Sequence, residues 1–347
     1  SGKGSYRADL LQEPEKHADN AAMDVAKRLV AGGIAGAIAK TVIAPLDRTK
    51  IIFQTNPDKK FNARNVIKEL ANIVAKEGGT GLWRGNMATV LRVFPYAGIQ
   101  FAAFDVYKRA LKGRAGPGGL SAIQRLLAGS AAGATAVSLT YPLDLVRARL
   151  AVRRDWSNTK SGQVWWDAIT GGTGRMSIRE LYRGLHPTLL GILPYAGIAF
   201  FTRDTLNSLA AKHFDTSALQ TPLAAKMASG AVAGLVAQSS TYPLDLVRRR
   251  MQTEGFVEVK GVPQPSGIRQ TNLQHKSIWG SLKIIYHTEG ARGLFKGLSM
   301  NWIKGPVAFM ISFTVFDYLK LYFRIQGHET QKMAPPKDSK GIPEDSK

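Results

Sequence analysis

The stretches PLDRTK (45–50), PLDLVR (142–147) and PLDLVR (243–248) repeat one pattern three times in a chain of 347 residues. In each copy a proline is followed two residues later by an aspartate and five residues later by a base. The copies lie about 100 residues apart, so the chain is an array of repeats. An enzyme with one active site needs such a motif once, and its triplication predicts that three equivalent segments act together.

The sequence around each copy is repeated as well. A helix rich in Gly and Ala leads into each proline, a composition that lets membrane helices pack closely, and the proline is expected to kink it. A short helical pattern follows near residues 63–75, 164–170 and 277–287. A second apolar helix then follows an aromatic-basic-glycine triplet. The triplets are Trp83-Arg84-Gly85, Tyr182-Arg183-Gly184 and Phe295-Lys296-Gly297.

These repeats predict an all-α membrane protein with six transmembrane helices in three tandem pseudo-three-fold repeats, each with a short surface helix. The expected repeats are residues 24–114, 115–215 and 216–325. A polar N-terminal tail (1–23) and a disordered C-terminal tail (326–347) flank them. A soluble helical solenoid is the alternative, but it requires polar outer faces that these helices lack.

Composition restricts the partners of the chain. The formal net charge is +22 and the pI is about 10.2, which predicts an anionic partner such as nucleic acid, acidic lipid or a phosphate-rich solute. The mean hydropathy of −0.11 is lowered by polar segments between nearly uncharged helices, so it does not exclude a membrane protein. There is no cysteine, and the six histidines lie singly, so we expect no metal site and no cofactor.

Charged residues inside the apolar helices are expected to have a function, because they are costly at membrane depth. Lys40, Asp47 and Gln54 are spaced by seven and share one helix face. Each motif aspartate could form an exposed pair with the base three residues later, which would stabilise the helix by a few tenths of a kcal/mol. That alternative leaves the proline unexplained. If the kinks draw the helix ends together, each aspartate can instead meet the base of the next repeat.

The triplicated motif, together with its aromatic-basic-glycine partners, resembles the mitochondrial carrier family over roughly residues 24–325. The resemblance implies a monomeric, multi-pass protein of the inner mitochondrial membrane that works by alternating access and has no catalytic residues. The matrix gate that it implies consists of Asp47, Lys50, Asp144, Arg147, Asp245 and Arg248, braced by Gln54 and Gln252, with Ala151 leaving the middle repeat unbraced. The implied cytoplasmic gate consists of Asp105, Lys108, Asp204, Asp317 and Lys320, with Asn207 in place of a third base. The second repeat also has Met176-Ser177 where the other repeats have Glu-Gly.

The resemblance also places the solute at three positions on the second helix of each repeat. These are Arg92, Gly191-Ile192 and Lys304, and Lys40 adds a further charge. The glycine can open a flat apolar slot for an adenine ring, while the bases suit phosphates. Helix periodicity alone does not place these residues on one face with the gate, so the assignment depends on the resemblance. Lys40 could instead extend to the membrane interface.

Longer stretches at 40–54, 138–152, 242–253 and 296–306 resemble the nucleotide carriers of the family. They imply exchange of coenzyme A and related adenosine 3′,5′-diphosphate species for ADP. The alternative is another adenine nucleotide carrier, of the ATP/ADP or ATP-Mg/phosphate type. The resemblance further implies cardiolipin at the helix N-termini that follow Gly85, Gly184 and Gly297.

Two other classes of protein fit the sequence less well. A repeat protein that binds nucleic acid needs basic residues clustered on an exposed face among aromatics, whereas here the bases recur at helix ends and at single positions within helices. An enzyme needs a nucleophile–base constellation, a phosphate-binding loop or a metal cluster, and none is evident in the sequence. The sequence therefore predicts neither nucleic acid binding nor catalysis.

Overall fold

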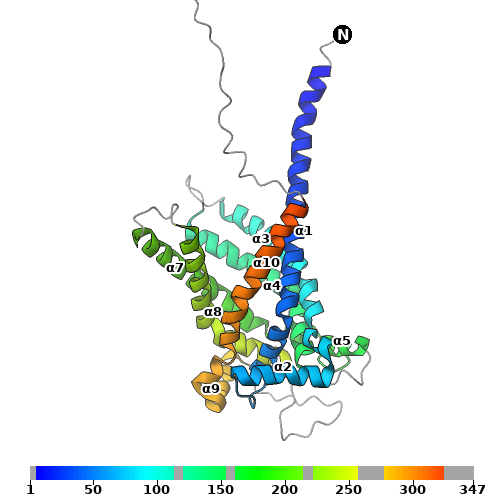
Figure 1. The fold of residues 1–347 in the computed structure, drawn as a ribbon, viewed down its shortest axis with the longest axis vertical. Helices are drawn as coiled ribbons and strands as arrows, with labels where there is room; N and C mark the ends of the chain where they lie inside the picture. The colour runs from blue at the N-terminus through cyan, green and yellow to red at the C-terminus, as the bar shows by residue number, and fades with distance from the viewer. Residues whose placement is uncertain (1–4, 113–119, 154–160, 214–221, 257–276, 324–347) are drawn as a thin grey trace, which may run out of the picture. The chain divides into compact units, whose positions relative to one another are not determined.

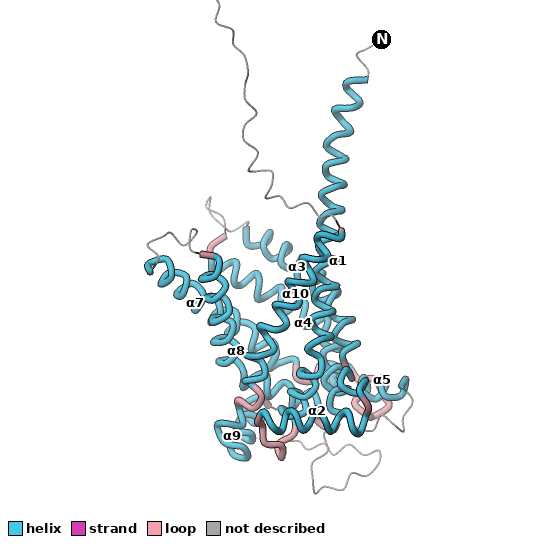
Figure 2. The backbone as a smooth tube through the Cα atoms, viewed as in Figure 1, coloured by secondary structure: helices cyan, strands magenta, loops and turns pink. Residues whose placement is uncertain are grey.

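The computed structural model describes residues 5–112, 120–153, 161–213, 222–256 and 277–323, and for residues 5–22, 24–26, 161 and 223 it describes the backbone alone. All regular structure in this part of the chain is helical (Figures 1 and 2). The helices are α1 (Ser5–Thr55), α2 (Ala63–Glu77), η1 (Gly79–Trp83), α3 (Asn86–Lys112), α4 (Ala122–Val152), α5 (Ser161–Thr170), α6 (Ile178–Leu181), α7 (Leu185–His213), α8 (Leu223–Thr253), α9 (Ile278–Leu294) and α10 (Leu298–Tyr322).

The chain divides into two compact units, Gly36–Ile311 and Ser1–Ala35 with Ser312–Lys347. The second of these contains the first part of α1 and the last part of α10, where Gly32 faces the Phe316 ring. Part of the predicted N-terminal tail belongs to α1, because the helix begins at Ser5. The C-terminal tail predicted at 326–347 lies outside the described residues.

Each repeat consists of a long helix, a short helical segment and a second long helix. The short helices expected near residues 63–75, 164–170 and 277–287 are confirmed as α2, α5 and α9. They lie at one end of the unit Gly36–Ile311, at the bottom of the view in Figure 1. Within this unit α3 packs against α4, and α7 packs against α8. Helix α4 also contacts α7 and α8, so it is the element around which the unit is built.

Four segments of the described chain are long and apolar enough to cross a membrane: Lys27–Thr55, Gly79–Lys112, Ala122–Val152 and Ile178–His213. Helices α8 and α10 hold the same places in the third repeat. The motif of α8 has three consecutive arginines, 248–250, which lower its hydropathy. Large apolar side chains such as Phe101 and Leu139 are exposed on these helices, as expected for surfaces that face lipid.

The motif prolines lie inside the long helices α1, α4 and α8. A proline has no N–H to donate, so the carbonyl four residues before it loses its helical partner. At Pro45 that carbonyl belongs to Thr41, and Trp83 Nε1 donates to it over 2.8 Å. Asn86 Nδ2 donates to the Thr41 hydroxyl over 3.0 Å. The aromatic residue of the first triplet therefore satisfies a backbone group that the motif proline leaves free.

The glycine of each triplet lies immediately before the second long helix, as predicted, and has a positive φ of 82° to 89°. A Cβ on Gly85 would lie 2.9 Å from the carbonyl oxygen of Arg147. On Gly184 it would lie 3.2 Å from the carbonyl oxygen of Arg248, and on Gly297 3.6 Å from Lys50 Cγ. Each glycine thus lets the chain turn directly against the motif base of the next repeat, where a side chain has little or no room.

We expect Gly85→Ala to destabilise the protein by roughly 1–3 kcal/mol, because alanine disfavours positive φ and its Cβ would meet a backbone atom of α4. Thermal unfolding in detergent should show a midpoint several degrees lower. Gly98→Ala is the matched control, since Gly98 lies in α3 and a Cβ added there would have nothing within 4 Å. Equal midpoints for the two variants would contradict the close approach at Gly85.

Candidate functional site

Charged side chains from α1, α4 and α8 meet in the interior of the unit Gly36–Ile311. Asp47 of the first repeat pairs with Arg147 of the second. Asp144 of the second repeat pairs with Arg248 of the third, at 2.6 Å between Oδ2 and Nη2. Each aspartate therefore meets the base of the next repeat, as the sequence predicted for these two pairs. Both carboxylates are almost completely buried, whereas the two arginines remain partly exposed.

The third pair differs from this expectation. Among the residues that the structure describes, neither Asp245 nor Lys50 has an ion pair within 4.0 Å. Lys50 Nζ instead lies 5.4 Å from the centre of the Tyr242 ring, where the π face attracts the ammonium group. The ring of motif residues is thus closed by two ion pairs and is open at the third position. The expectation of three equivalent pairs is wrong for this conformation.

The two predicted glutamine braces have different partners. Gln252 Nε2 donates to Asp144 Oδ2 and to the Tyr141 hydroxyl, both over 2.9 Å. Gln54 Nε2 donates to the Tyr242 hydroxyl over 2.9 Å, and its Oε1 is buried without a hydrogen-bond partner. Only Gln252 therefore contacts a motif carboxylate directly. The position of Ala151 has no side chain that could do so.

The tyrosines that precede two of the motif prolines were missed by the sequence analysis. The Tyr141 hydroxyl donates to the carbonyl of Arg183, and the Tyr242 hydroxyl donates to the carbonyl of Lys296. Each tyrosine thereby links the motif helix to the aromatic-basic-glycine triplet of its own repeat. The repeated letters TYPLD were the available signal; the first repeat has Ala44 at this position.

A second ring, of buried arginines, lies beside the ion pairs. Each repeat contributes one arginine whose Nε donates to a backbone carbonyl of the next repeat. The accepting carbonyl belongs to the residue seven positions after the motif aspartate of that next repeat. The same arginine pairs with a glutamate from the short segment of its own repeat. The arginines are Arg48, Arg149 and Arg250; the carbonyls belong to Ala151, Gln252 and Gln54; the glutamates are Glu77, Glu180 and Glu289.

The sequence analysis missed this ring because its members are not in register. Arg48 directly follows its motif aspartate, whereas Arg149 and Arg250 lie five positions after theirs. The difference of four residues is about one helical turn, so all three occupy the same face. The acid of the second repeat is shifted as well: Glu180 takes the role that the Met176-Ser177 substitution seemed to remove.

We expect Arg149→Lys to destabilise the protein by roughly 2–4 kcal/mol although it keeps the charge. One ammonium group cannot reproduce the guanidinium contacts with Glu180 and with the carbonyls of Gln252 and Ala168. A thermal unfolding scan in detergent measures the loss. The exposed Arg179 provides the control variant Arg179→Lys, and an unfolding midpoint shared by both would contradict the structural role of Arg149.

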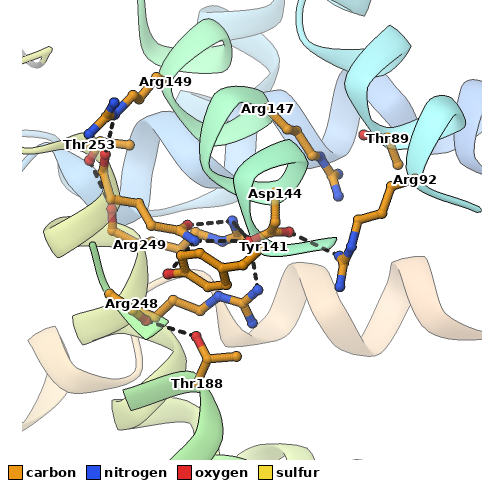
Figure 3. Close-up of polar contacts among 12 residues, drawn as sticks. Thr89, Arg92, Tyr141, Asp144, Arg147, Arg149, Thr188, Arg248, Arg249 and Thr253 are labelled. Atoms are coloured by element: carbon orange, nitrogen blue, oxygen red, sulfur yellow. Dashed lines mark hydrogen bonds and ion pairs between the residues drawn. The ribbon is translucent and has the colours of Figure 1, made fainter. Parts of the chain in front are cut away.

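Two residues predicted to bind the solute contact the motif carboxylates. Arg92 of α3 lies 3.2 Å from Asp144, between Nη1 and Oδ1, and donates through Nε to the Thr140 hydroxyl over 3.0 Å (Figure 3). Lys304 of α10 lies 2.7 Å from Asp47, between Nζ and Oδ1. The predicted solute-binding bases and the predicted gate are therefore directly coupled by charge.

The other predicted solute positions lie close to this centre. Lys40 is half-buried, and its charge interacts with those of Lys304 and Asp47. Gly191 of α7 faces α8, where an added Cβ would lie 3.8 Å from a Leu244 methyl group. Ile192 packs against the buried cluster of Val137, Tyr141 and Leu145. Both positions predicted to contact adenine thus lie beside apolar side chains, Ile192 beside residues that flank Asp144 and Gly191 beside Leu244, which precedes Asp245.

Arg249 is a further functional candidate that sequence reasoning missed. Its Nη1 lies 3.3 Å from Asp144 Oδ2 and 2.8 Å from Gln252 Oε1. Figure 3 shows Arg92 approaching Asp144 from one side and Arg248 and Arg249 from the other. One carboxylate is therefore shared by three guanidinium groups. The run of three arginines at 248–250 was the available signal.

The residues of the predicted outer gate are arranged differently. Asp105, Lys108 and Asp204 are exposed on α3 and α7, and no ion pair joins them within the described residues. Asn207 accepts a hydrogen bond from Ser229 over 2.5 Å, so it ties α7 to α8. The remaining two, Asp317 and Lys320, belong to the other unit, where Lys320 Nζ lies 5.9 Å from the Phe316 ring. In the described part of the chain no three metal-ligating side chains gather.

Three repeats of paired apolar helices around a charged centre define a solute carrier of the membrane. The model of the family "Mitochondrial carrier protein" matches residues 21–115, 118–214 and 219–327, and the chain therefore belongs to this family of inner-membrane, multi-pass transporters.

Several curated proteins are similar over most of their length. The human and rat proteins named "Mitochondrial coenzyme A transporter SLC25A42" are both 47% identical over 306 residues, covering 86% of this chain and 89% of each relative. The protein named "Mitochondrial carrier protein CoAc1" from Arabidopsis thaliana is 38% identical over 323 residues, covering 89% of this chain and 93% of that protein.

Proposed function

We propose that this carrier exchanges coenzyme A and related adenosine 3′,5′-diphosphate species for ADP by alternating access. The observation that supports it most is the pairing of Arg92 and Lys304 with the motif carboxylates Asp144 and Asp47. The names of the similar proteins from human, rat and Arabidopsis point in the same direction.

The charge of the centre suits a polyanionic solute. Seven cationic side chains surround three carboxylates, so the formal excess is four positive charges (seven minus three). The cations are Lys40, Lys50, Arg92, Arg147, Arg248, Arg249 and Lys304, and the carboxylates are Asp47, Asp144 and Asp245. Coenzyme A has a phosphomonoester and a diphosphate on one adenosine, and a solute with that much negative charge compensates an excess of this size.

The pairing also suggests how binding opens the gate. A phosphate that approaches Arg92 and Lys304 competes with Asp144 and Asp47 for these bases. Each base that it removes takes a counter-charge from a buried carboxylate and so weakens the matrix gate. The solute then has the difference in affinity between the two gate states that any switch requires. The open third position, at Asp245 and Lys50, leaves fewer ion pairs to break.

We expect Arg92→Ala and Lys304→Ala to abolish exchange while the protein stays folded, because neither side chain belongs to the buried arginine ring. Exchange is measured in proteoliposomes, and folding by thermal unfolding of the same preparations. Arg179→Ala, which removes an exposed positive charge elsewhere, should exchange at the wild-type rate. Wild-type rates in the first two variants would refute their assignment to the solute site.

The substrate is tested with labelled coenzyme A outside cardiolipin-containing liposomes that hold the purified protein and internal ADP. We expect saturable uptake that disappears when internal ADP is omitted. If coenzyme A is not taken up while ADP exchanges rapidly for ATP in the same vesicles, the protein is another adenine nucleotide carrier. Cardiolipin binding after Gly85, Gly184 and Gly297, and the monomeric state, remain predictions.

A further inference from the structure

Arg249 departs from the pseudo-three-fold pattern at the charged centre. It lies four positions after its motif aspartate, and the equivalent residues in the first two repeats are Ile51 and Ala148. The gate residues recur because three repeats build the gate together. A nucleotide has no three-fold symmetry, so its groups must be distinguished by positions at which the repeats differ. Arg249 is such a position, and it lies on the motif face of α8.

The contacts of Asp144 leave positive charge available for an anion. Its single carboxylate is 2% exposed and contacts Arg92, Arg248 and Arg249. The one negative charge of the carboxylate balances the positive charge of only one of these arginines. Arg248 is the closest, at 2.6 Å, whereas Arg92 and Arg249 lie at 3.2 and 3.3 Å. The side chains of these two arginines retain 20% and 17% of their exposure. An entering anion can therefore contact two partly exposed guanidinium groups, whose distances to Asp144 are the longer ones, while the carboxylate itself is covered.

The proposed solute-binding bases in contact with Asp144 are of a different kind from the one in contact with Asp47. Two arginines, Arg92 and Arg249, contact Asp144, while Lys304 contacts Asp47 and the charge of Lys40 lies nearby. The planar guanidinium fork matches a terminal phosphate, which offers three oxygens to paired donors. An ammonium group is a compact point charge that suits the single free charge on each phosphate of a bridging diphosphate.

The position of the adenine contacts decides which phosphate goes where. Ile192 packs against the buried cluster that contains Tyr141. The Tyr141 hydroxyl receives a hydrogen bond from the same Gln252 side chain that contacts Asp144. The predicted adenine site is thus adjacent to the arginine group. In coenzyme A both phosphate groups are attached to the ribose, the phosphomonoester at its 3′ oxygen and the diphosphate at its 5′ oxygen. The phosphomonoester ends there with three oxygens, whereas the diphosphate continues into the pantetheine arm. The terminal group therefore matches the arginines beside the adenine site, and the bridging diphosphate matches the lysines.

We propose that Arg249 is a further substrate-binding residue, which with Arg92 takes the terminal 3′-phosphate of coenzyme A, while Lys304 and Lys40 take the diphosphate. The assignment rests on the proposed function and adds to it a specificity site for the 3′-phosphate.

The test compares coenzyme A with 3′-dephospho-coenzyme A in proteoliposomes loaded with ADP, for the wild type and for Arg249→Gln. We expect the wild type to have the higher kcat/KM for coenzyme A, and the variant to lose at least about ten-fold of this preference, as expected when a charge-assisted hydrogen bond is removed. Arg249 also contacts Asp144 and Gln252, so the variant can weaken the gate. A weaker gate changes both solutes alike, and the ratio between them isolates recognition of the 3′-phosphate.

Two further variants complete the test. Arg249→Lys retains the charge and should retain part of the preference, whereas the exposed-site control Arg179→Gln should retain all of it. The thermal shift that each solute produces in detergent gives the same comparison without transport. An unchanged ratio in Arg249→Gln, or a wild type that accepts both solutes equally, would overturn the role of Arg249. A wild type that ignores coenzyme A but exchanges ADP for ATP would overturn the proposed function itself.

Discussion

The structure depends on the burial of carboxylates inside a membrane protein. Asp144 and Asp47 are 2% and 6% exposed, and an uncompensated charge in such a position costs several kcal/mol. Each is therefore held by bases from other helices. Asp144 on α4 draws in Arg92 from α3 and two arginines from α8, while Asp47 on α1 draws in Arg147 from α4 and Lys304 from α10. The carboxylates thus link five long helices, and the proposed alternating access requires an exchange of these partners.

The contacts that would change in the proposed alternating access are separate from those that hold the helices together. The buried arginines, exemplified by Arg149, donate to backbone carbonyls of the next repeat and pair with glutamates of their own short segments. The hydrogen bonds and ion pairs of a fully desolvated guanidinium group with several fixed acceptors cost much free energy to break. The motif ion pairs are held by partly exposed bases, and one position, at Lys50 and Asp245, has none within reach in the described residues. The buried arginines and the motif ion pairs lie side by side on the same helices, each buried arginine one or five positions after its motif aspartate.

Residues that recur in all three repeats hold the helices together, whereas residues that differ between repeats lie at the charged centre. The triplet glycines, the motif acids and the buried arginines occur once in each repeat and form the common frame. The differences between repeats are concentrated at the centre: Gly191 faces Leu244, three arginines meet at Asp144, and Asp47 pairs with one lysine and one arginine. A frame of this kind can serve many solutes, because its recognition residues can vary without loss of the contacts that hold the helices together.

Sequence alone determined the three repeats, the short helices, the turn glycines and two of the motif ion pairs. It could do so because these features depend on spacing and residue type within one repeat: a proline, an acid and a base at fixed offsets, and a glycine where the chain turns. Beyond these two pairs, it did not determine which partners the charges choose across repeats. The roles of Arg48 and Glu180 were hidden by shifts of register. Arg249 and Tyr242 gain their roles from groups about 50 to 190 residues away, namely the Asp144 and Gln54 side chains and the Lys296 carbonyl. Tertiary structure decided these, because a charge inside a membrane protein pairs with whatever partner is near in space, and distance along the chain does not reveal it.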